Sequence, residues 1–217
     1  FALVVALPVA ATRLADGRLT WNVPHRDGVD DVAFVAGVLD LLLARFRIDP
    51  ARVYATGFSG GARLASVLAC RLADRIAAIG VVGGLQGPDP DREGGSAPRA
   101  VPLLAFHAVE DPVNPFDGDP RRSPGYWTHG IEEAIGRWRT RLGCGSEERR
   151  TIRPGIEQRH LLGCAGAEVA VYVLRGSGHT WPGSRFTFPE ALGPVEQAID
   201  ATALTLAWFR RFALPTR

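Results

Sequence analysis

The chain has 217 residues, of which 46% are apolar and 22% charged, a composition typical of one globular domain with a single hydrophobic core. Its formal net charge is only +2, and the sequence contains no lysine, so arginine supplies every basic side chain apart from histidine. This weak, scattered charge excludes a dedicated nucleic-acid binder, and no apolar run reaches the roughly 20 residues that a membrane span needs.

The N-terminal part of the chain predicts a strand, a loop and a helix. Residues 3–7 form an apolar run that predicts a buried strand. Because the sequence lacks methionine and starts inside this pattern, we expect that residues precede Phe1 and that any targeting signal lies out of sight. Apolar residues at helical spacing over residues 32–46 predict an amphipathic helix, with Asp30 as its N-terminal cap.

The next segment has the pattern of a nucleophile elbow. Residues 53–55 predict a short buried strand, residues 57–61 fit Gly-x-Ser-x-Gly, and a helical pattern follows. A serine at the tip of such a turn has a strained backbone, and the N–H groups at the helix start stabilise negative charge. Ser59 is therefore the candidate nucleophile, and the Gly60 backbone N–H is the candidate oxyanion donor.

The rest of the chain alternates short apolar strands with helices. Strands are predicted at residues 76–82, 101–106 and 169–174, and helices at residues 131–142 and 195–212. Strands that are apolar on both faces and alternate with helices indicate an α/β fold, with a mostly parallel sheet covered by helices on both faces. Without a repeat or a linker, residues 1–217 form one predicted domain.

A serine nucleophile needs a base and a carboxylate, and in a parallel sheet both come from loops after the carboxyl ends of strands. Asp111 follows the strand at 101–106, with Glu110 as the alternative acid. His179 follows the strand at 169–174 in a Gly-rich loop. The order Ser59, Asp111, His179 is that of α/β-hydrolases. The other histidines are interpreted as loop, helix-start or locally packed residues: His25, His107, His129 and His160.

The three cysteines fall into two groups. Cys70 lies on the apolar side of the helix after Ser59, which indicates a small core residue. Cys144 and Cys164 flank an Arg-rich polar stretch that we interpret as a surface loop. On spacing alone, the pair is equally compatible with a disulfide and with two free thiols.

Four segments together resemble the secreted polyhydroxybutyrate depolymerase and feruloyl esterase family of α/β-hydrolases. They are residues 29–35, 52–61, 106–112 and 178–183, of which the last, Gly-His-Thr-Trp-Pro-Gly, is the most discriminating. The resemblance runs from about Phe1 to the last helix. It implies a triad of Ser59, Asp111 and His179, and a secreted or cell-envelope protein of bacterial origin.

The resemblance also implies two features outside the triad. The family carries a cysteine pair placed like Cys144 and Cys164, which favours the disulfide. The family's oxyanion loop, a His-Gly segment after an earlier strand, has no counterpart here. We therefore expect the N-terminal strands of the fold to be missing from this chain, which would make it an N-terminally incomplete catalytic unit. Alternatively, residues 3–7 pair with the strand at 53–55.

These observations predict a serine carboxylic-ester hydrolase that works through an acyl-enzyme on polyester (polyhydroxybutyrate-like) or on feruloyl or acetyl polysaccharide esters. Phe58 and Trp181 are expected to contact the substrate, although Trp181 could instead only pack its loop. No metal or organic cofactor is implied, because no His/Cys/Asp cluster has ligand spacing. The expected partner is an ester, polymeric or small; the oligomeric state is open. The alternatives are a peptidase or thioesterase with the same triad, and a non-catalytic binding protein on a hydrolase scaffold.

Overall fold

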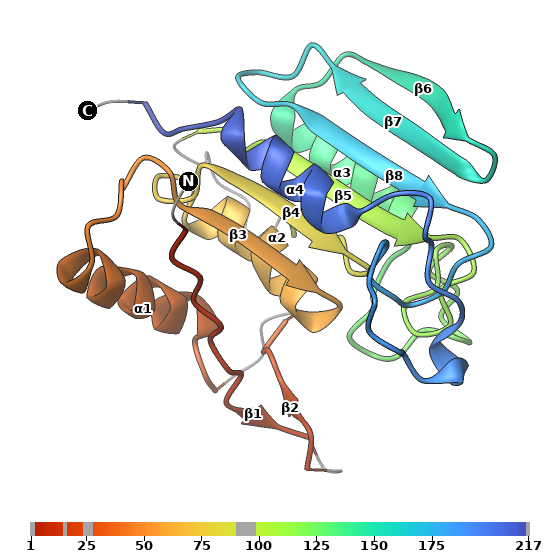
Figure 1. Ribbon diagram of the computed structural model, residues 1–217, viewed down its shortest axis with the longest axis horizontal. Helices are drawn as coiled ribbons and strands as arrows, with labels where there is room; N and C mark the ends of the chain where they lie inside the picture. Colours follow the sequence, from red (N-terminus) through yellow and green to blue (C-terminus); the bar gives the residue numbers. More distant parts are fainter. Residues whose placement is uncertain (1–2, 15–16, 24–27, 90–98, 216–217) are drawn as a thin grey trace.

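A six-stranded, mostly parallel sheet forms the centre of the computed structural model, which describes residues 3–14, 17–23, 28–89 and 99–215 (Figure 1). The strand order is β3-β4-β5-β8-β7-β6. Strands β3, β4, β5 and β8 run parallel, and β7 and β6 continue the sheet as an antiparallel hairpin. The strands span Tyr54–Phe58 (β3), Ala78–Val82 (β4), Leu103–Ala108 (β5), Ser146–Arg153 (β6), Ile156–Leu162 (β7) and Val169–Leu174 (β8).

Helices cover both faces of the sheet, as the alternating pattern predicts. Helices α2 (Gly60–Arg71) and α3 (Ile131–Leu142) pack on one face, in a core that contains Ile79, Leu103 and Val171. Helix α4 (Ala201–Arg210) packs on the opposite face. This α/β arrangement places the carboxyl ends of β3, β4, β5 and β8 at one edge of the sheet, where the candidate residues lie (Figure 1).

Helix α1 (Asp31–Arg45) packs beside α2 rather than on the sheet. Asp30 caps it as predicted, because its side chain accepts a hydrogen bond of 3.0 Å from the Ala33 N–H. Val32 and Val35 of α1 pack in a cluster with Leu64 and Leu68 of α2. A separate two-stranded ribbon, β1 (Thr12–Arg13) and β2 (Leu19–Thr20), precedes α1. Within the described ranges, no helix is both long and apolar enough to cross a bilayer.

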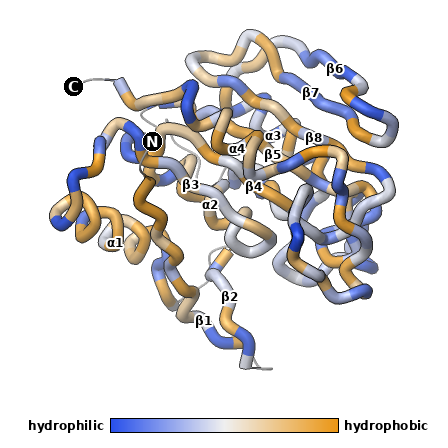
Figure 2. The backbone as a smooth tube through the Cα atoms, in the orientation of Figure 1, coloured by the Kyte–Doolittle hydropathy of each residue, from blue (hydrophilic) through white to orange (hydrophobic). Residues whose placement is uncertain are grey.

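The predicted strand at residues 3–7 is wrong. These residues adopt no regular structure, and Leu3, Val4, Val5 and Leu7 are each more than half exposed. The segment is nevertheless strongly apolar (Figure 2). A strand needs a neighbour to receive its backbone hydrogen bonds, and β3 pairs with β4 but with no second strand among the described residues. Pairing of residues 3–7 with the strand at 53–55 is therefore also ruled out in this structure.

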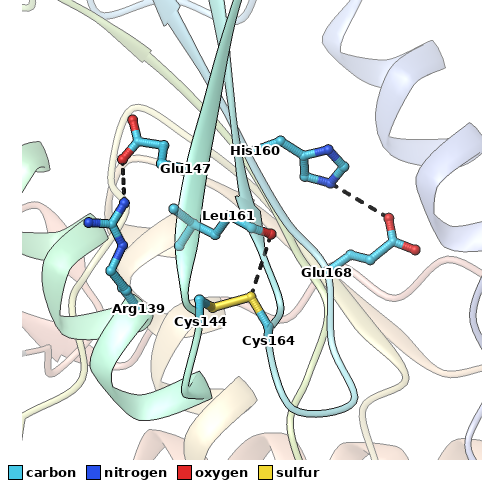
Figure 3. Close-up of a disulfide and its surroundings, with 7 residues drawn as sticks. All are labelled: Arg139, Cys144, Glu147, His160, Leu161, Cys164 and Glu168. Carbon is cyan, nitrogen blue, oxygen red and sulfur yellow. Dashed lines mark hydrogen bonds and ion pairs between the residues drawn. A yellow bond between two sulfur atoms is a disulfide. The ribbon is translucent and has the colours of Figure 1, made fainter.

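The Arg-rich stretch between Cys144 and Cys164 is a hairpin and not a loop. Strand β7 pairs with β8, and β6 forms the outer edge of the sheet. The missed strand β6 has no apolar alternation because both of its faces carry charged side chains, for example Arg149 2.7 Å from Glu147. Cys144 and Cys164 form the predicted disulfide across the base of this hairpin, with an S–S distance of 2.09 Å (Figure 3). Beside it, Arg139 of α3 pairs with Glu147 at 2.6 Å.

Candidate active site

Ser59 occupies the tip of a sharp turn between β3 and α2. Its backbone angles are φ 54° and ψ −115°, which makes it the one non-glycine residue with positive φ in the described part of the chain. Such a conformation costs about 1–3 kcal/mol and persists only where the surroundings enforce it. The close approach of strand and helix enforces it here, because a Cβ on Gly57 would overlap the backbone carbonyl of Gly61. The Ser59 N–H donates to the Val82 carbonyl at 2.9 Å, which fixes the turn to β4.

Asp111 and His179 form a buried hydrogen-bonded pair. Asp111 Oδ2 lies 2.7 Å from His179 Nδ1, and the two residues are only 2% and 4% exposed. The other carboxylate oxygen, Oδ1, accepts the backbone N–H groups of Val113 and Asn114, both at 2.8 Å. With Oδ1 occupied in this way, Oδ2 faces the imidazole as an acceptor. His179 Nδ1 therefore carries the proton, and the lone pair of the neutral ring lies on Nε2.

Gly83, at the end of β4, brings the pair next to the elbow. A Cβ on Gly83 would lie 3.3 Å from both Cε1 and Nδ1 of His179, and equally close to the Phe58 ring. The Phe58 and His179 rings are themselves 4.7 Å apart between centroids. Phe58 precedes Ser59 in the chain, and Val82, which precedes Gly83, accepts the Ser59 N–H. The imidazole thus packs against both segments that hold the serine.

The structure separates Asp111 from the alternative acid, Glu110. Glu110 is exposed and its carboxylate accepts the N–H of Gly176 at 2.9 Å, whereas the imidazole bonds to Asp111. His107 is the other histidine near Asp111, at 3.6 Å, but its Nε2 donates to the Asn114 carbonyl at 2.9 Å. Burial lowers the pKa of His107, so this ring stays neutral inside the core.

The loop that carries His179 is held by a segment that the sequence analysis did not single out. The His179 N–H donates to the Leu192 carbonyl at 2.7 Å, beside the short 3₁₀ helix η1 (Glu190–Leu192). The Thr180 hydroxyl donates to the Pro194 carbonyl at 3.1 Å. These bonds fix the backbone on both sides of the imidazole, although nothing in the pattern of residues 184–194 indicated this contact.

Asn114 is a second residue that sequence reasoning missed. It is fully buried, and its side-chain amide donates to the Gly83 carbonyl at 2.6 Å while its own N–H binds Asp111. It therefore ties the acid-bearing loop to the end of β4. The run Asp-Pro-Val-Asn held a signal for it, because an aspartate commonly accepts N–H groups two and three residues ahead in a turn.

Phe58 packs against the His179 ring, and Trp181 packs against Phe58. Their rings meet edge to face at 6.5 Å, and Phe188 lies 6.0 Å from Phe58 in the same manner. All three are partly exposed. The Trp181 indole also donates to the Thr202 hydroxyl at 2.9 Å, so it fixes its loop to α4 as well.

The remaining histidines have other environments. His129 Nε2 accepts the Gly87 N–H at 2.9 Å, and burial, reinforced by the nearby Arg137 charge, lowers its pKa to about 4. His160 belongs to β7, not to a loop as interpreted from the sequence, and lies 3.7 Å from Glu168 (Figure 3). His25 lies outside the described residues.

Comparison with known proteins shows the family to which this chain belongs. The model of a family described as esterase PHB (polyhydroxybutyrate) depolymerase matches residues 19–126. A protein that carries the name esterase NocK, from Nocardia uniformis subsp. tsuyamanensis, is 32% identical over 189 residues, which are 78% of this chain and 54% of the relative. Feruloyl esterase C of Emericella nidulans is 36% identical over 89 residues, 41% of this chain and 32% of the relative. This chain belongs to the polyhydroxybutyrate depolymerase and feruloyl esterase-like family.

Comparison with solved structures agrees with an α/β-hydrolase fold. Acetyl xylan esterase from Aspergillus awamori superposes with a TM-score of 0.51 at 16% identity, over 69% of this chain and 62% of that one, a likeness that concerns the fold alone. Feruloyl esterase B of Piromyces equi is 28% identical over 165 residues, 73% of this chain and 31% of the relative. The chain spans about half or less of the length of these curated relatives.

Proposed function

We propose that this esterase-family chain is a serine carboxylic-ester hydrolase that works through an acyl-enzyme, with Ser59 as nucleophile, His179 as base and Asp111 as the residue that orients the base. The observation that carries the proposal is the strained Ser59 turn packed against a buried His179–Asp111 hydrogen bond of 2.7 Å. Strain at a serine is rarely maintained without a functional reason, and the bond fixes the imidazole tautomer that accepts a serine proton.

The geometry supports a two-step reaction. Ser59 Oγ attacks the ester carbonyl carbon while its proton passes to His179 Nε2, and Asp111 stabilises the imidazolium that forms. The C–O bond to the alcohol then breaks as Nε2 returns this proton to the leaving oxygen. Water attacks the acyl-enzyme in the same way, which releases the acid and restores Ser59. The Gly60 N–H, at the start of α2, would hold the negative oxygen of each tetrahedral intermediate.

A second oxyanion donor is expected beyond Gly60, and the open side of β3 suggests where it belongs. We propose that a strand outside the described residues covers this side in the working enzyme and brings the second donor. Loss of one donor typically costs about 10²–10³ in turnover. The 217-residue chain alone should then hydrolyse esters weakly and exchange the outward-facing amide hydrogens of Tyr54–Phe58 rapidly. Ester hydrolysis at a full enzymatic rate, together with slow hydrogen exchange of these amides, would contradict this proposal.

The substrate class is proposed from the aromatic group beside His179. The Phe58 ring packs against His179, and the Trp181 and Phe188 rings meet Phe58 edge to face, so three partly exposed rings form a group that suits an apolar or aromatic acyl group. The proposed substrates are polyhydroxybutyrate-like polyesters and feruloyl or acetyl esters of polysaccharides, and the family and relatives named above carry the first two in their names.

A substrate panel tests both parts of the proposal. We expect turnover of p-nitrophenyl acetate and butyrate, methyl ferulate and hydroxybutyrate oligomers, and none of peptide anilides. Trp181→Ala should lower the ratio of kcat/KM for methyl ferulate to kcat/KM for p-nitrophenyl acetate. Phe186→Ala is the matched control, because the Phe186 ring is 67% exposed, and it should leave this ratio unchanged. Anilide cleavage at the ester rate would favour a peptidase. A Trp181→Ala variant that loses stability but keeps the ratio would make Trp181 a packing residue only.

The disulfide supports a proposal about location. Disulfides persist in oxidising compartments and are rare where thiols are kept reduced. The Cys144–Cys164 bridge at the base of the hairpin therefore fits a secreted or cell-envelope protein. Recovery of the protein from its source with both thiols reduced would contradict this location.

A further inference from the structure

Arg63 is a buried cation one turn beyond the nucleophile. It lies in the first turn of α2 and is 3% exposed. Its guanidinium stacks over the Tyr126 ring, 3.9 Å from the centroid. Nη2 lies 3.4 Å from the point that a Cβ on Gly60 would occupy, and Trp21 lies 3.7 Å from that same point. The side chain therefore ends beside the residue whose N–H is the candidate oxyanion donor.

The Arg63 charge lacks the acceptors that a buried arginine normally has. Its Nε and Nη1 are sealed from solvent and make no hydrogen bond in the structure. Arg159 is a useful contrast, because it is 5% exposed and binds two carboxylates, Glu132 at 2.7 Å and Glu157 at 2.8 Å. The partner of Arg63 is Tyr126, through its ring and its hydroxyl, and no carboxylate among the described residues balances the positive charge.

A guanidinium in this position attracts an anion strongly. Arginine cannot neutralise itself as a buried lysine does, so its charge remains, although burial lowers the pKa of this group. A charge held out of water without a partner is costly, and the cost falls when a carboxylate binds it. Because Nε and Nη1 are closed off, such a carboxylate would reach the guanidinium at Nη2, on the Gly60 side.

We propose that Arg63 is a specificity-determining residue that receives a carboxylate of the substrate beside Gly60. This rests on the proposed ester hydrolysis and deepens it. The carboxylate could belong to a short acyl group that ends in an acid, or to the acid end of a hydroxyacid chain on the alcohol side of the scissile ester. Its chemistry is the same in both cases: an anionic oxygen a few bonds from the ester carbonyl.

Two substrate pairs distinguish the sources. On the acyl side, monomethyl succinate carries a carboxylate where methyl butyrate carries a methyl group. On the alcohol side, the 3-hydroxybutyrate dimer with a free carboxylate is compared with its primary amide. For each pair, kcat/KM is measured in the unmodified protein and in Arg63→Met, Arg63→Lys and the surface control Arg150→Met.

We expect Arg63→Met to lower kcat/KM for the carboxylate member of one pair about tenfold to hundredfold more than for its neutral partner, as for a lost hydrogen bond to a charged group. Arg63→Lys should recover part of the difference, and Arg150→Met should show none. An equal loss for both members of both pairs would mean that Arg63 only supports the fold, and would overturn the proposal.

A binding measurement decides the matter even if a variant fails to fold or no ester is turned over. In the Ser59→Ala protein, NMR titration should show binding at least about tenfold tighter for the carboxylate member of one pair than for its neutral partner. Equal affinities in both pairs would overturn the role of Arg63. A clear binding preference without any ester hydrolysis in the unmodified protein would instead overturn the proposed function and leave the carboxylate site standing.

Discussion

Substitution of Asp111 by asparagine should remove catalysis while leaving the fold intact. The reason lies in the three N–H groups that surround the carboxylate. Oδ1 accepts two backbone N–H groups at 2.8 Å, from Val113 and Asn114, so the oxygen of an asparagine must occupy that place. The amide nitrogen then takes the place of Oδ2, 2.7 Å from His179 Nδ1. There it is a donor, and Nδ1 can only accept.

The expected loss follows from the tautomer that this geometry imposes. If Nδ1 accepts, the proton of the neutral ring moves to Nε2, the nitrogen that must take the Ser59 proton. Stabilisation of the imidazolium is lost as well. In serine hydrolases this exchange lowers kcat by about 10⁴, or about 5 kcal/mol of activation free energy. The asparagine still accepts the two backbone N–H groups through its oxygen and still bonds to Nδ1 through its amide nitrogen. Because all three hydrogen bonds are kept, we expect the free energy of unfolding to change little.

Glu110→Gln is the matched control, because Glu110 is the adjacent acid and its oxygen accepts one backbone N–H, from Gly176. A glutamine oxygen can accept the same bond, so kcat should stay within about threefold, well under 1 kcal/mol. The assay is p-nitrophenyl butyrate hydrolysis with kcat and KM resolved, together with urea unfolding. A purely structural role for Asp111 would lower stability and kcat together. Equal losses in the two variants, or a larger loss in Glu110→Gln, would refute the assignment.

Three other predictions rest on separate parts of the structure. Cys144→Ser should lower the unfolding free energy by about 3 kcal/mol, given the 20-residue separation that the bridge closes. In the unmodified protein, alkylation in denaturant should label one thiol before reduction and three after, and three before reduction would exclude the bridge. His129 has its folded pKa lowered to about 4, below the unfolded value, so its contribution to stability is present above about pH 6.5 and is lost as the pH falls toward 4. Urea unfolding should therefore show a loss of about 2 kcal/mol over this range that His129→Gln removes and His160→Gln does not; parallel curves for the parent and His129→Gln would contradict it. Gly83 has φ +61° and lies against the His179 ring, so Gly83→Ala should lower kcat at least tenfold, about 1.4 kcal/mol. The control Gly136→Ala, where an added Cβ would meet no atom within 4 Å, should leave kcat unchanged. Unchanged turnover in Gly83→Ala would show that the ring has room to move.

Much of the fold was predictable because its signals are local. Strand β8 and helix α3 have the predicted bounds, since an apolar run and a helical stripe each carry their own period. The elbow was predictable for the same reason: its glycines, serine and flanking elements are contiguous in the chain. The Asp111–His179 pair is 68 residues apart in sequence, yet the rule that loops meet at the carboxyl edge of a parallel sheet brought them together.

The misses have a common physical origin in contacts between distant segments. Residues 3–7 have the composition of a buried strand but no strand to pair with, so sequence hydrophobicity alone gave the wrong prediction. Strand β6 has the opposite problem, because it is an outer strand whose exposed faces carry ion pairs in place of apolar side chains. The hydrogen bond from the His179 N–H to the Leu192 carbonyl and the unpaired charge of Arg63 depend on packing that no local pattern encodes.

The central claim, that Ser59 is an activated nucleophile, is tested most directly by covalent labelling with a fluorophosphonate. Intact mass and peptide mapping should show one probe per chain, attached to Ser59. A folded Ser59→Ala protein should remain unlabelled, and Asp111→Asn should be labelled far more slowly than Glu110→Gln. A folded, unmodified protein that takes up no probe, or that takes it up at another residue, would contradict the account.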